Sequence, residues 1–338
     1  MKRKSCLPSL LLIFLVAATP ALAQKKSGKI VTLHVQFVDQ AGNRLSGIQP
    51  EEIQVLEGGR LQENLQVIGP DTPFDVGLLL DVSPSAHQNV DAIRRDTHAF
   101  FTALPFQTEA LILTFDAEVY VDCDWTTDRK KVEEAIFEIG LHKPGSKSKI
   151  YDALDLTLDL KYVERGPRHT LILFSDGMEN SSKLSEKKAI EEVRKAGILT
   201  YAIQYDSRPY YRRLYGGPHY DPRRSTDIPG SGTDVGGIYV GSGRNERDMA
   251  EYKVQTKYKN ASKRMKSLGD AGRGEYFQMA NWSDLPDIYG RILDQLEGVF
   301  TIRYLSQQQP DRRFHSVRVA TTRPDVTVRQ ITKGYWAY

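Results

Sequence analysis

The most constraining feature of this 338-residue sequence is a continuous apolar run at residues 76–80 that ends abruptly at Asp81. Uninterrupted apolar runs of this length are typical of central parallel strands, which are buried on both faces of a sheet. In open α/β sheets, ligands bind just beyond the carboxyl ends of such strands. The run therefore predicts a helix-covered parallel sheet with a functional site at Asp81.

The region 74–297 supports this fold class because predicted strands and helices alternate along it. An apolar helix stripe is expected where Val254, Tyr258, Ala261, Met265 and Leu268 recur at steps of four and three. We expect a Rossmann-like, doubly wound, mostly parallel sheet. Its strands are predicted at 76–80, 110–115, 119–123, 170–174, 198–205 and 274–279, and its other helices at 90–104, 130–139, 151–162, 186–196 and 285–296.

Both ends of the chain predict β-structure instead. Residues 28–70 contain candidate strands at 30–38, 53–56 and 61–67, and residues 298–338 contain others at 300–305, 316–320 and 326–331. The N-terminal set is too small to be stable alone. We therefore predict a small β-sandwich, formed by N- and C-terminal strands, into which the α/β domain is inserted.

Residues 206–250 interrupt the periodic pattern, which is lost between Asp206 and Arg247. The segment is dense in Gly, Pro, Tyr and Arg and is predicted to be an inserted loop. Two interpretations stay open: a mobile surface loop that binds no partner, or a surface rich in aromatic and arginine side chains that contacts a protein partner.

Residues 1–23 have the pattern of a cleavable signal peptide: a basic start, an apolar stretch at 7–18 and a small-residue cleavage site ending at Ala23. The apolar stretch is shorter than the roughly 20 residues needed to cross a bilayer. The expected mature chain is therefore exported, either periplasmic or secreted, and is not an integral membrane protein.

Charge and cysteine content limit the function further. The formal net charge of +3 falls to zero without the three cations of the signal, which removes the whole-domain argument for nucleic acid or anionic lipid. Cys6 leaves with the signal, so Cys123 has no intramolecular disulfide partner and is predicted to be a buried small hydrophobe.

Oxygen-bearing side chains follow the first apolar run in the pattern Asp-x-Ser-x-Ser, formed by Asp81, Ser83 and Ser85. Side chains two residues apart at a strand-to-helix turn can face the same ion, and hard oxygens suit Mg²⁺, with Mn²⁺ or Ca²⁺ as alternatives. A second apolar run at 170–174 also leads to an acid, Asp176. These residues predict a divalent metal site.

The sequence here resembles the von Willebrand factor A (VWA) family, whose metal-ion-dependent adhesion site joins Asp-x-Ser-x-Ser to a threonine and an aspartate on two later loops. The segment 144–154 resembles the second loop and places Ser148 at the threonine position, while Ser-Asp-Gly at 175–177 resembles the third with Asp176. The resemblance implies a metal site of Asp81, Ser83, Ser85, Ser148 and Asp176, with no catalytic residues. It also implies a protein partner that offers an Asp or Glu to the metal. The β-rich flanks are similar to secreted bacterial proteins called Acidobacterial-type VWFA-related.

Three residues depart from the family pattern. Pro84 replaces a usual glycine, which fixes φ, removes an N–H and biases Ser83 away from the helical region. Lys147 and Lys149 flank Ser148, where an ammonium would repel a metal. The alternative to metal binding is therefore a metal-independent structural or assembly protein of the cell envelope, with a degenerate site.

Enzymatic alternatives have less support in the sequence. A phosphohydrolase with an aspartate nucleophile needs a second carboxylate two residues after Asp81, where Ser83 stands. No Gly-x-Ser-x-Gly elbow indicates a serine hydrolase, and the seven histidines lack zinc-like spacing. Asp116 also follows a predicted strand, but the family does not use this position as a direct ligand.

Overall fold

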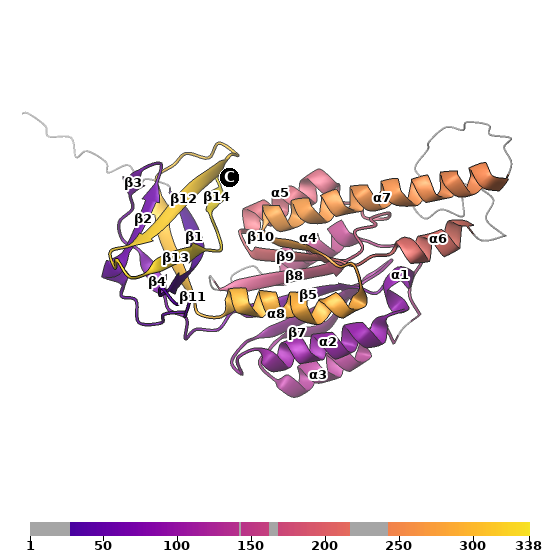
Figure 1. Cartoon of the computed structure of the whole chain (residues 1–338), viewed down its shortest axis with the longest axis horizontal. Coiled ribbons are helices and arrows are strands. Elements are labelled where there is room, and N and C mark those ends of the chain that lie inside the picture. Colours follow the sequence, from indigo (N-terminus) through magenta and orange to yellow (C-terminus); the bar gives the residue numbers. More distant parts are fainter. Residues whose placement is uncertain (1–27, 142, 162–167, 217–242) are drawn as a thin grey trace, which may run out of the picture.

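The computed structural model describes residues 28–141, 143–161, 168–216 and 243–338. A six-stranded sheet flanked by helices lies beside a second unit built from two four-stranded sheets (Figure 1). This arrangement confirms the predicted fold class of a mostly parallel α/β sheet with additional antiparallel sheets from the chain ends. The predicted signal peptide lies outside the described residues.

The six-stranded sheet has the spatial order β10-β9-β8-β5-β6-β7. All neighbouring pairs are parallel except β6 with the edge strand β7. The apolar run around Asp81 forms β5, which lies between β6 and β8 and is buried from Val76 onward. The strands are β5 Asp75–Asp81, β6 Ala110–Phe115, β7 Val119–Thr126, β8 His169–Ser175, β9 Leu199–Gln204 and β10 Arg273–Gln278.

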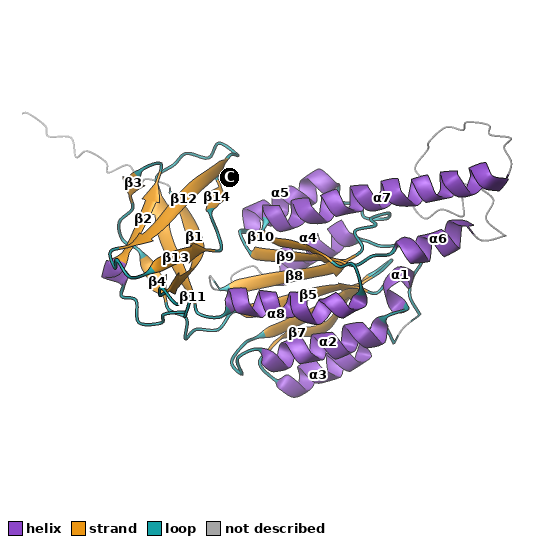
Figure 2. Ribbon diagram, in the orientation of Figure 1, coloured by secondary structure: helices purple, strands orange, loops and turns teal. Residues whose placement is uncertain are grey.

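Helices cover both faces of this sheet (Figure 2). Leu78 and Leu80 of β5 face a core shared with α2 Val90–Ala103, α3 Arg129–Glu138 and α8 Leu285–Leu296. Leu79 points to the opposite core, shared with α4 Ile150–Lys161, α5 Glu186–Ala196 and α7 Gly243–Ala271. Short helices follow β5 and β9, namely α1 Pro84–His87 and α6 Arg208–Gly216, and 3₁₀ turns span Pro50–Glu52 and Trp282–Asp284. No helix within the described ranges is long and apolar enough to cross a membrane.

Each of the two smaller sheets combines strands from both chain ends, as the split sandwich requires. One has the order β13-β1-β11-β4 and the other β14-β12-β2-β3. Their facing side chains form one core that includes Leu33, Val55, Phe300 and Val319. The strands are β1 Lys29–Val38, β2 Ile53–Glu57, β3 Arg60–Leu61, β4 Gln66–Ile68, β11 Val299–Ser306, β12 Phe314–Thr321, β13 Thr327–Gln330 and β14 Gly334–Trp336.

Two predicted elements differ from the structure. The single strand expected at 61–67 is two short strands, β3 and β4, which belong to different sheets. Asn64 lies between them with φ of 54°, and this left-handed residue redirects the chain. The predicted loop 206–250 contains α6 and the beginning of α7, because Tyr211 and Tyr215, one turn apart, pack on Ala250 and Val254 of α7.

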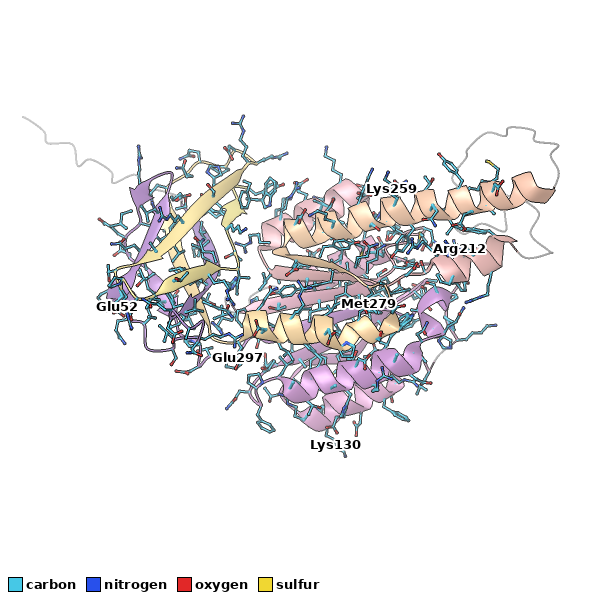
Figure 3. All side chains as sticks on the ribbon, in the orientation of Figure 1. Glu52, Lys130, Arg212, Lys259, Met279 and Glu297 are labelled. Carbon is cyan, nitrogen blue, oxygen red and sulfur yellow. The ribbon has the colours of Figure 1, made fainter. Side chains whose placement is uncertain are left out.

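A buried arginine and an exposed ion pair connect the sandwich to the α/β domain. The Arg168 guanidinium, next to β8, donates from Nη1 to the Val299 carbonyl and to Thr301 Oγ1, both at 2.9 Å. It also lies 4.2 Å from the centre of the Phe74 ring. At the end of α8, Glu297, labelled in Figure 3, pairs with Arg44 at 2.9 Å. These contacts lie at the amino ends of the parallel strands, so the opposite edge of the sheet stays clear of the sandwich.

Candidate metal centre

Asp81 is the last residue of β5 and is fully buried. Its Oδ1 accepts a hydrogen bond from the Ser83 N–H at 2.9 Å, and its Oδ2 accepts one from Ser175 Oγ at 2.7 Å. The carboxylate is therefore held by its own loop and by the end of the neighbouring strand β8. Ser175 was not among the predicted site residues, although it directly precedes Asp176 in the Ser-Asp-Gly segment.

Pro84 is compatible with the first loop. It occupies the first turn of α1, where its missing N–H leaves no helical hydrogen bond unmade. Ser83 has φ of −58° and ψ of 167°, an extended ψ that suits a residue before proline. The hydroxyls of Ser83 and Ser85 lie 3.2 Å apart, so both reach the same point.

The third loop meets the first through Ser85, whose Oγ donates to Asp176 Oδ2 at 3.0 Å. The other oxygen, Oδ1, accepts from the Met178 N–H at 2.8 Å. Gly177 follows with φ of 77°, and a Cβ there would lie 2.9 Å from the Ala261 carbonyl oxygen. Glycine is therefore required for the turn that presents Asp176.

The second loop places Ser148 next to the third. Its N–H donates to Asn180 Oδ1 at 2.8 Å, and its carbonyl accepts from the Asn180 N–H at 3.3 Å. The Ser148 hydroxyl is buried, and it makes no hydrogen bond to any residue that the structure describes. Asp81, Ser83, Ser85 and Asp176 are thus linked by hydrogen bonds to one another. Within the described residues no hydrogen bond joins Ser148 to these four, and its backbone is bonded to Asn180 of the third loop instead.

Asp116 supports the second loop, and its side-chain hydrogen bonds to described residues are to the N–H groups of Gly145 and Glu118. Its Oδ2 accepts from the Gly145 N–H at 2.6 Å, and its carbonyl accepts from the Lys149 N–H at 3.0 Å. The Lys149 ammonium pairs with Glu118 at 3.2 Å, which neutralises one of the two charges expected to oppose a metal. Lys147 is exposed.

The family model described as von Willebrand factor type A domain matches residues 75–219, which include all five predicted site residues. Residues 75–219 form a VWA domain. Domains of this family are generally non-enzymatic protein-interaction modules and often bind a divalent metal. No match was found among curated protein sequences.

Three solved structures are among those similar to this chain. A von Willebrand factor type A protein from Catenulispora acidiphila has 8% identity and a TM-score of 0.46 over 91% of this chain and 73% of its own. The conserved hypothetical protein BatB from Bacteroides thetaiotaomicron has 15% identity and a TM-score of 0.42 over 66% and 98%. Proximal thread matrix protein 1 from the mussel byssus, with a zinc-occupied MIDAS motif, has 10% identity and a TM-score of 0.43 over 66% and 48%. The chain thus spans about half the length of the mussel protein.

Two buried acids dominate the electrostatics of the VWA site. Burial, and then the charge of Asp176, raise the pKa of Asp81 to about 7. Burial likewise raises the pKa of Asp176. No ion pair within the described part of the chain includes either carboxylate, and Arg264, the cation that acts on Asp176, is paired with Glu186. The site therefore concentrates negative charge without a matching side-chain cation.

The donor set of the VWA site fits a hard divalent cation. It offers two carboxylates and three hydroxyls, all oxygen ligands of the kind that Mg²⁺ prefers. The buried Ser148 hydroxyl has no hydrogen-bond partner among the described residues and is an oxygen ligand that such a cation would satisfy. No group of three or more His, Cys, Asp and Glu residues in the described ranges could hold a metal, so the VWA site depends on its hydroxyls as well as on its two carboxylates.

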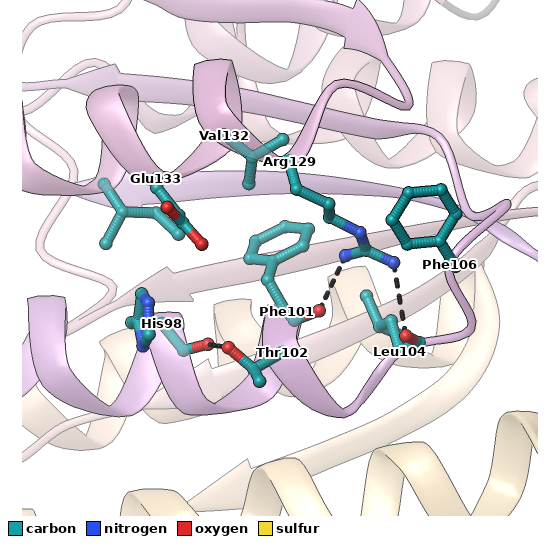
Figure 4. Close-up of a pocket in the computed structure, with 9 residues that line it drawn as sticks. His98, Phe101, Thr102, Leu104, Phe106, Arg129, Val132 and Glu133 are labelled. Atoms are coloured by element: carbon teal, nitrogen blue, oxygen red, sulfur yellow. Dashed lines mark hydrogen bonds between the residues drawn. The ribbon is translucent and has the colours of Figure 1, made fainter.

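A separate pocket of about 260 Å³ lies between α2 and α3 (Figure 4). Its guanidinium, Arg129, donates to the carbonyls of Phe101 and Leu104 at the end of α2. Because α2 begins near the carboxyl edge of the sheet and runs away from it, this pocket lies far along the helix from the VWA site. Its main polar group is already engaged in capping α2. The lining residues are His98, Phe101, Thr102, Leu104, Phe106, Arg129, Val132, Glu133 and Ile136.

Proposed function

We propose that the VWA domain is a non-enzymatic binding module of an exported protein. In this proposal Asp81, Ser83, Ser85, Ser148 and Asp176 hold a divalent cation, Mg²⁺ or a similar hard ion, and a protein partner supplies an Asp or Glu. The observation that carries the proposal is the pair of buried carboxylates, linked through Ser83 and Ser85, with which no side-chain cation of the described residues forms an ion pair.

Each loop has a separate task in this function. The first loop supplies Asp81 and two hydroxyls, the second supplies the free hydroxyl of Ser148, and the third supplies Asp176. A bound Mg²⁺ would add an electrophilic position for a carboxylate, because this ion usually keeps several water ligands that can be exchanged. Hydrogen bonds from Ser83 and Ser175 hold Asp81 in place before any ligand arrives.

Titration calorimetry with Mg²⁺ or Mn²⁺ tests the metal step. The mature protein should bind one ion, Asp81→Ala should bind none, and Asp71→Ala, which removes an exposed carboxylate outside the site, should bind normally. Absence of binding by the unaltered protein would reject the metal role. Capture of partner proteins with and without EDTA then tests whether binding depends on the cation.

A metal-independent docking role has one observation in its favour. Ile30 of β1 and Leu305 of β11 are direct cross-strand neighbours and are 55% and 48% exposed, an unusual adjacent apolar pair on the sandwich surface. If the sandwich docks onto another envelope protein, capture of that partner should persist in EDTA and be lost in the double variant Ile30→Ser, Leu305→Ser. If EDTA abolishes capture and the double variant still captures the partner, the VWA site is favoured as the binding surface.

A further inference from the structure

The end of β9 reaches the same edge of the sheet as β5 and β8, and it brings two side chains that no sequence motif indicated. Gln204 Nε2 donates to the Asp176 carbonyl at 2.8 Å. The next residue, Tyr205, places its hydroxyl 3.0 Å from Ser85 Oγ. Both side chains are fully buried. β9 is therefore a fourth structural contributor to a site that the motif assigns to three loops.

The position of the Tyr205 hydroxyl is fixed by its ring. The ring stacks on Phe174 with centroids 5.2 Å apart and lies 5.3 Å from Trp282 on another side. The Tyr205 N–H donates to the Ser175 carbonyl at 3.3 Å, which anchors the backbone to the end of β8. A side chain packed in this way cannot swing away from Ser85 without opening the core.

The hydrogen-bond capacity of Ser85 determines what this contact does. A serine hydroxyl has one hydrogen to donate and two lone pairs. Because Ser85 donates to Asp176, Tyr205 must act as the donor to Ser85 and occupy one lone pair. For the same reason the Ser83 hydroxyl, 3.2 Å away, donates to the second lone pair, so a cation can use this lone pair only after the Ser83 hydroxyl hydrogen has turned away.

We propose that Tyr205 is a positioning residue of the metal centre: its hydroxyl takes one lone pair of Ser85 and holds the Ser85 oxygen in place, so that the lone pair that now accepts from Ser83 is the one that would serve a cation. The inference rests on the proposed metal binding, because without a cation this orientation has no ligand to serve. Residues that orient a ligand by a second hydrogen bond typically change metal affinity by about 10-fold or more when they are removed.

Tyr205→Phe tests the inference because phenylalanine keeps the ring stack and removes only the hydroxyl. The matched control is Tyr201→Phe on the same strand, where an equally buried tyrosine contacts Gln295 Oε1 at 2.9 Å and no site residue. The measurements are the Mg²⁺ dissociation constant by calorimetry and the unfolding temperature in EDTA. We expect both variants to lose similar stability, and only Tyr205→Phe to raise the dissociation constant about 10-fold.

A double-variant comparison separates positioning from general loosening. If Tyr205 acts through Ser85, adding Tyr205→Phe to Ser85→Ala should change the Mg²⁺ dissociation constant little further. Mg²⁺ affinity equal in the two tyrosine variants, or an undiminished effect in the Ser85→Ala background, would overturn the inference and leave the metal site intact. Failure of the unaltered protein to bind Mg²⁺ would overturn the inference together with the proposed function.

Discussion

Replacing Asp81 with asparagine should make the cation-free protein more stable while it abolishes cation binding. Burial and the Asp176 charge raise the pKa of Asp81 from 3.8 to about 7 in the folded protein. Because the folded state favours the protonated acid, stability falls as the pH rises from 3.8 to about 7 and stays lowered above that. Asparagine removes the charge and keeps an oxygen to accept from Ser83.

The size of the effect follows from the pKa change. A rise from 3.8 to about 7 corresponds to about 4 kcal/mol of lost stability once Asp81 is fully ionised. Since Asp176 shares this repulsion, we expect a gain of about 2–4 kcal/mol for Asp81→Asn near pH 8 in EDTA. Near pH 4 the gain should almost vanish, because most of the wild-type carboxyl is then protonated in the folded state.

Urea unfolding in EDTA at the two pH values measures this gain. The exposed control Asp71→Asn should change stability by less than about 0.5 kcal/mol. Added Mg²⁺ should stabilise the unaltered protein and leave the stability of Asp81→Asn unchanged. The stability advantage of Asp81→Asn should therefore shrink or reverse when Mg²⁺ is present. An Asp81→Asn protein that is less stable than the unaltered one near pH 8 in EDTA would refute the idea of an uncompensated buried charge.

Three other substitutions separate the parts of the site. Ser148→Ala removes a hydroxyl that has no hydrogen-bond partner among the described residues, so the free energy of unfolding in EDTA should change by less than about 0.5 kcal/mol while calorimetry shows weaker Mg²⁺ binding. Asp116→Ala leaves the N–H groups of Gly145 and Glu118 without their acceptor, so the free energy of unfolding measured in urea should fall by about 3 kcal/mol and Mg²⁺ binding should weaken. Unchanged Mg²⁺ binding would show that the second loop needs no such support. Arg168→Met leaves the Val299 carbonyl and Thr301 Oγ1 at the sandwich junction without their donor, so the free energy of unfolding should fall by about 2–4 kcal/mol. Mg²⁺ affinity should stay unchanged, because the junction lies at the opposite edge of the sheet from the metal site.

Much of the fold could be predicted because its strongest signals are local. The apolar run before Asp81 identified the central strand, and the alternating β-patterns at the chain ends indicated a split sandwich. The helix stripe from Val254 to Leu268 is buried as expected, and Cys123 is buried too. The left-handed turn at Asn64 was missed because asparagine carries only a weak signal for this conformation.

The site was predictable to the extent that its residues lie in motifs. Asp81, Ser83, Ser85 and Asp176 are joined by hydrogen bonds, and their metal role stays a prediction. The supporting contacts of Ser175, Asn180 and Tyr205 depend on how strands and loops meet in space. Tyr205, for example, is 120 residues from Ser85 and resembles any other buried aromatic residue in the sequence.

A crystal structure with Mn²⁺, solved with anomalous data, is the most direct test of the central claim. The account predicts one anomalous peak bounded by Asp81, Ser83, Ser85, Ser148 and Asp176, with the Ser148 hydroxyl turned toward the ion. No peak at this position would contradict the account, most clearly if Ser83 and Ser85 kept their mutual hydrogen bond at saturating Mn²⁺.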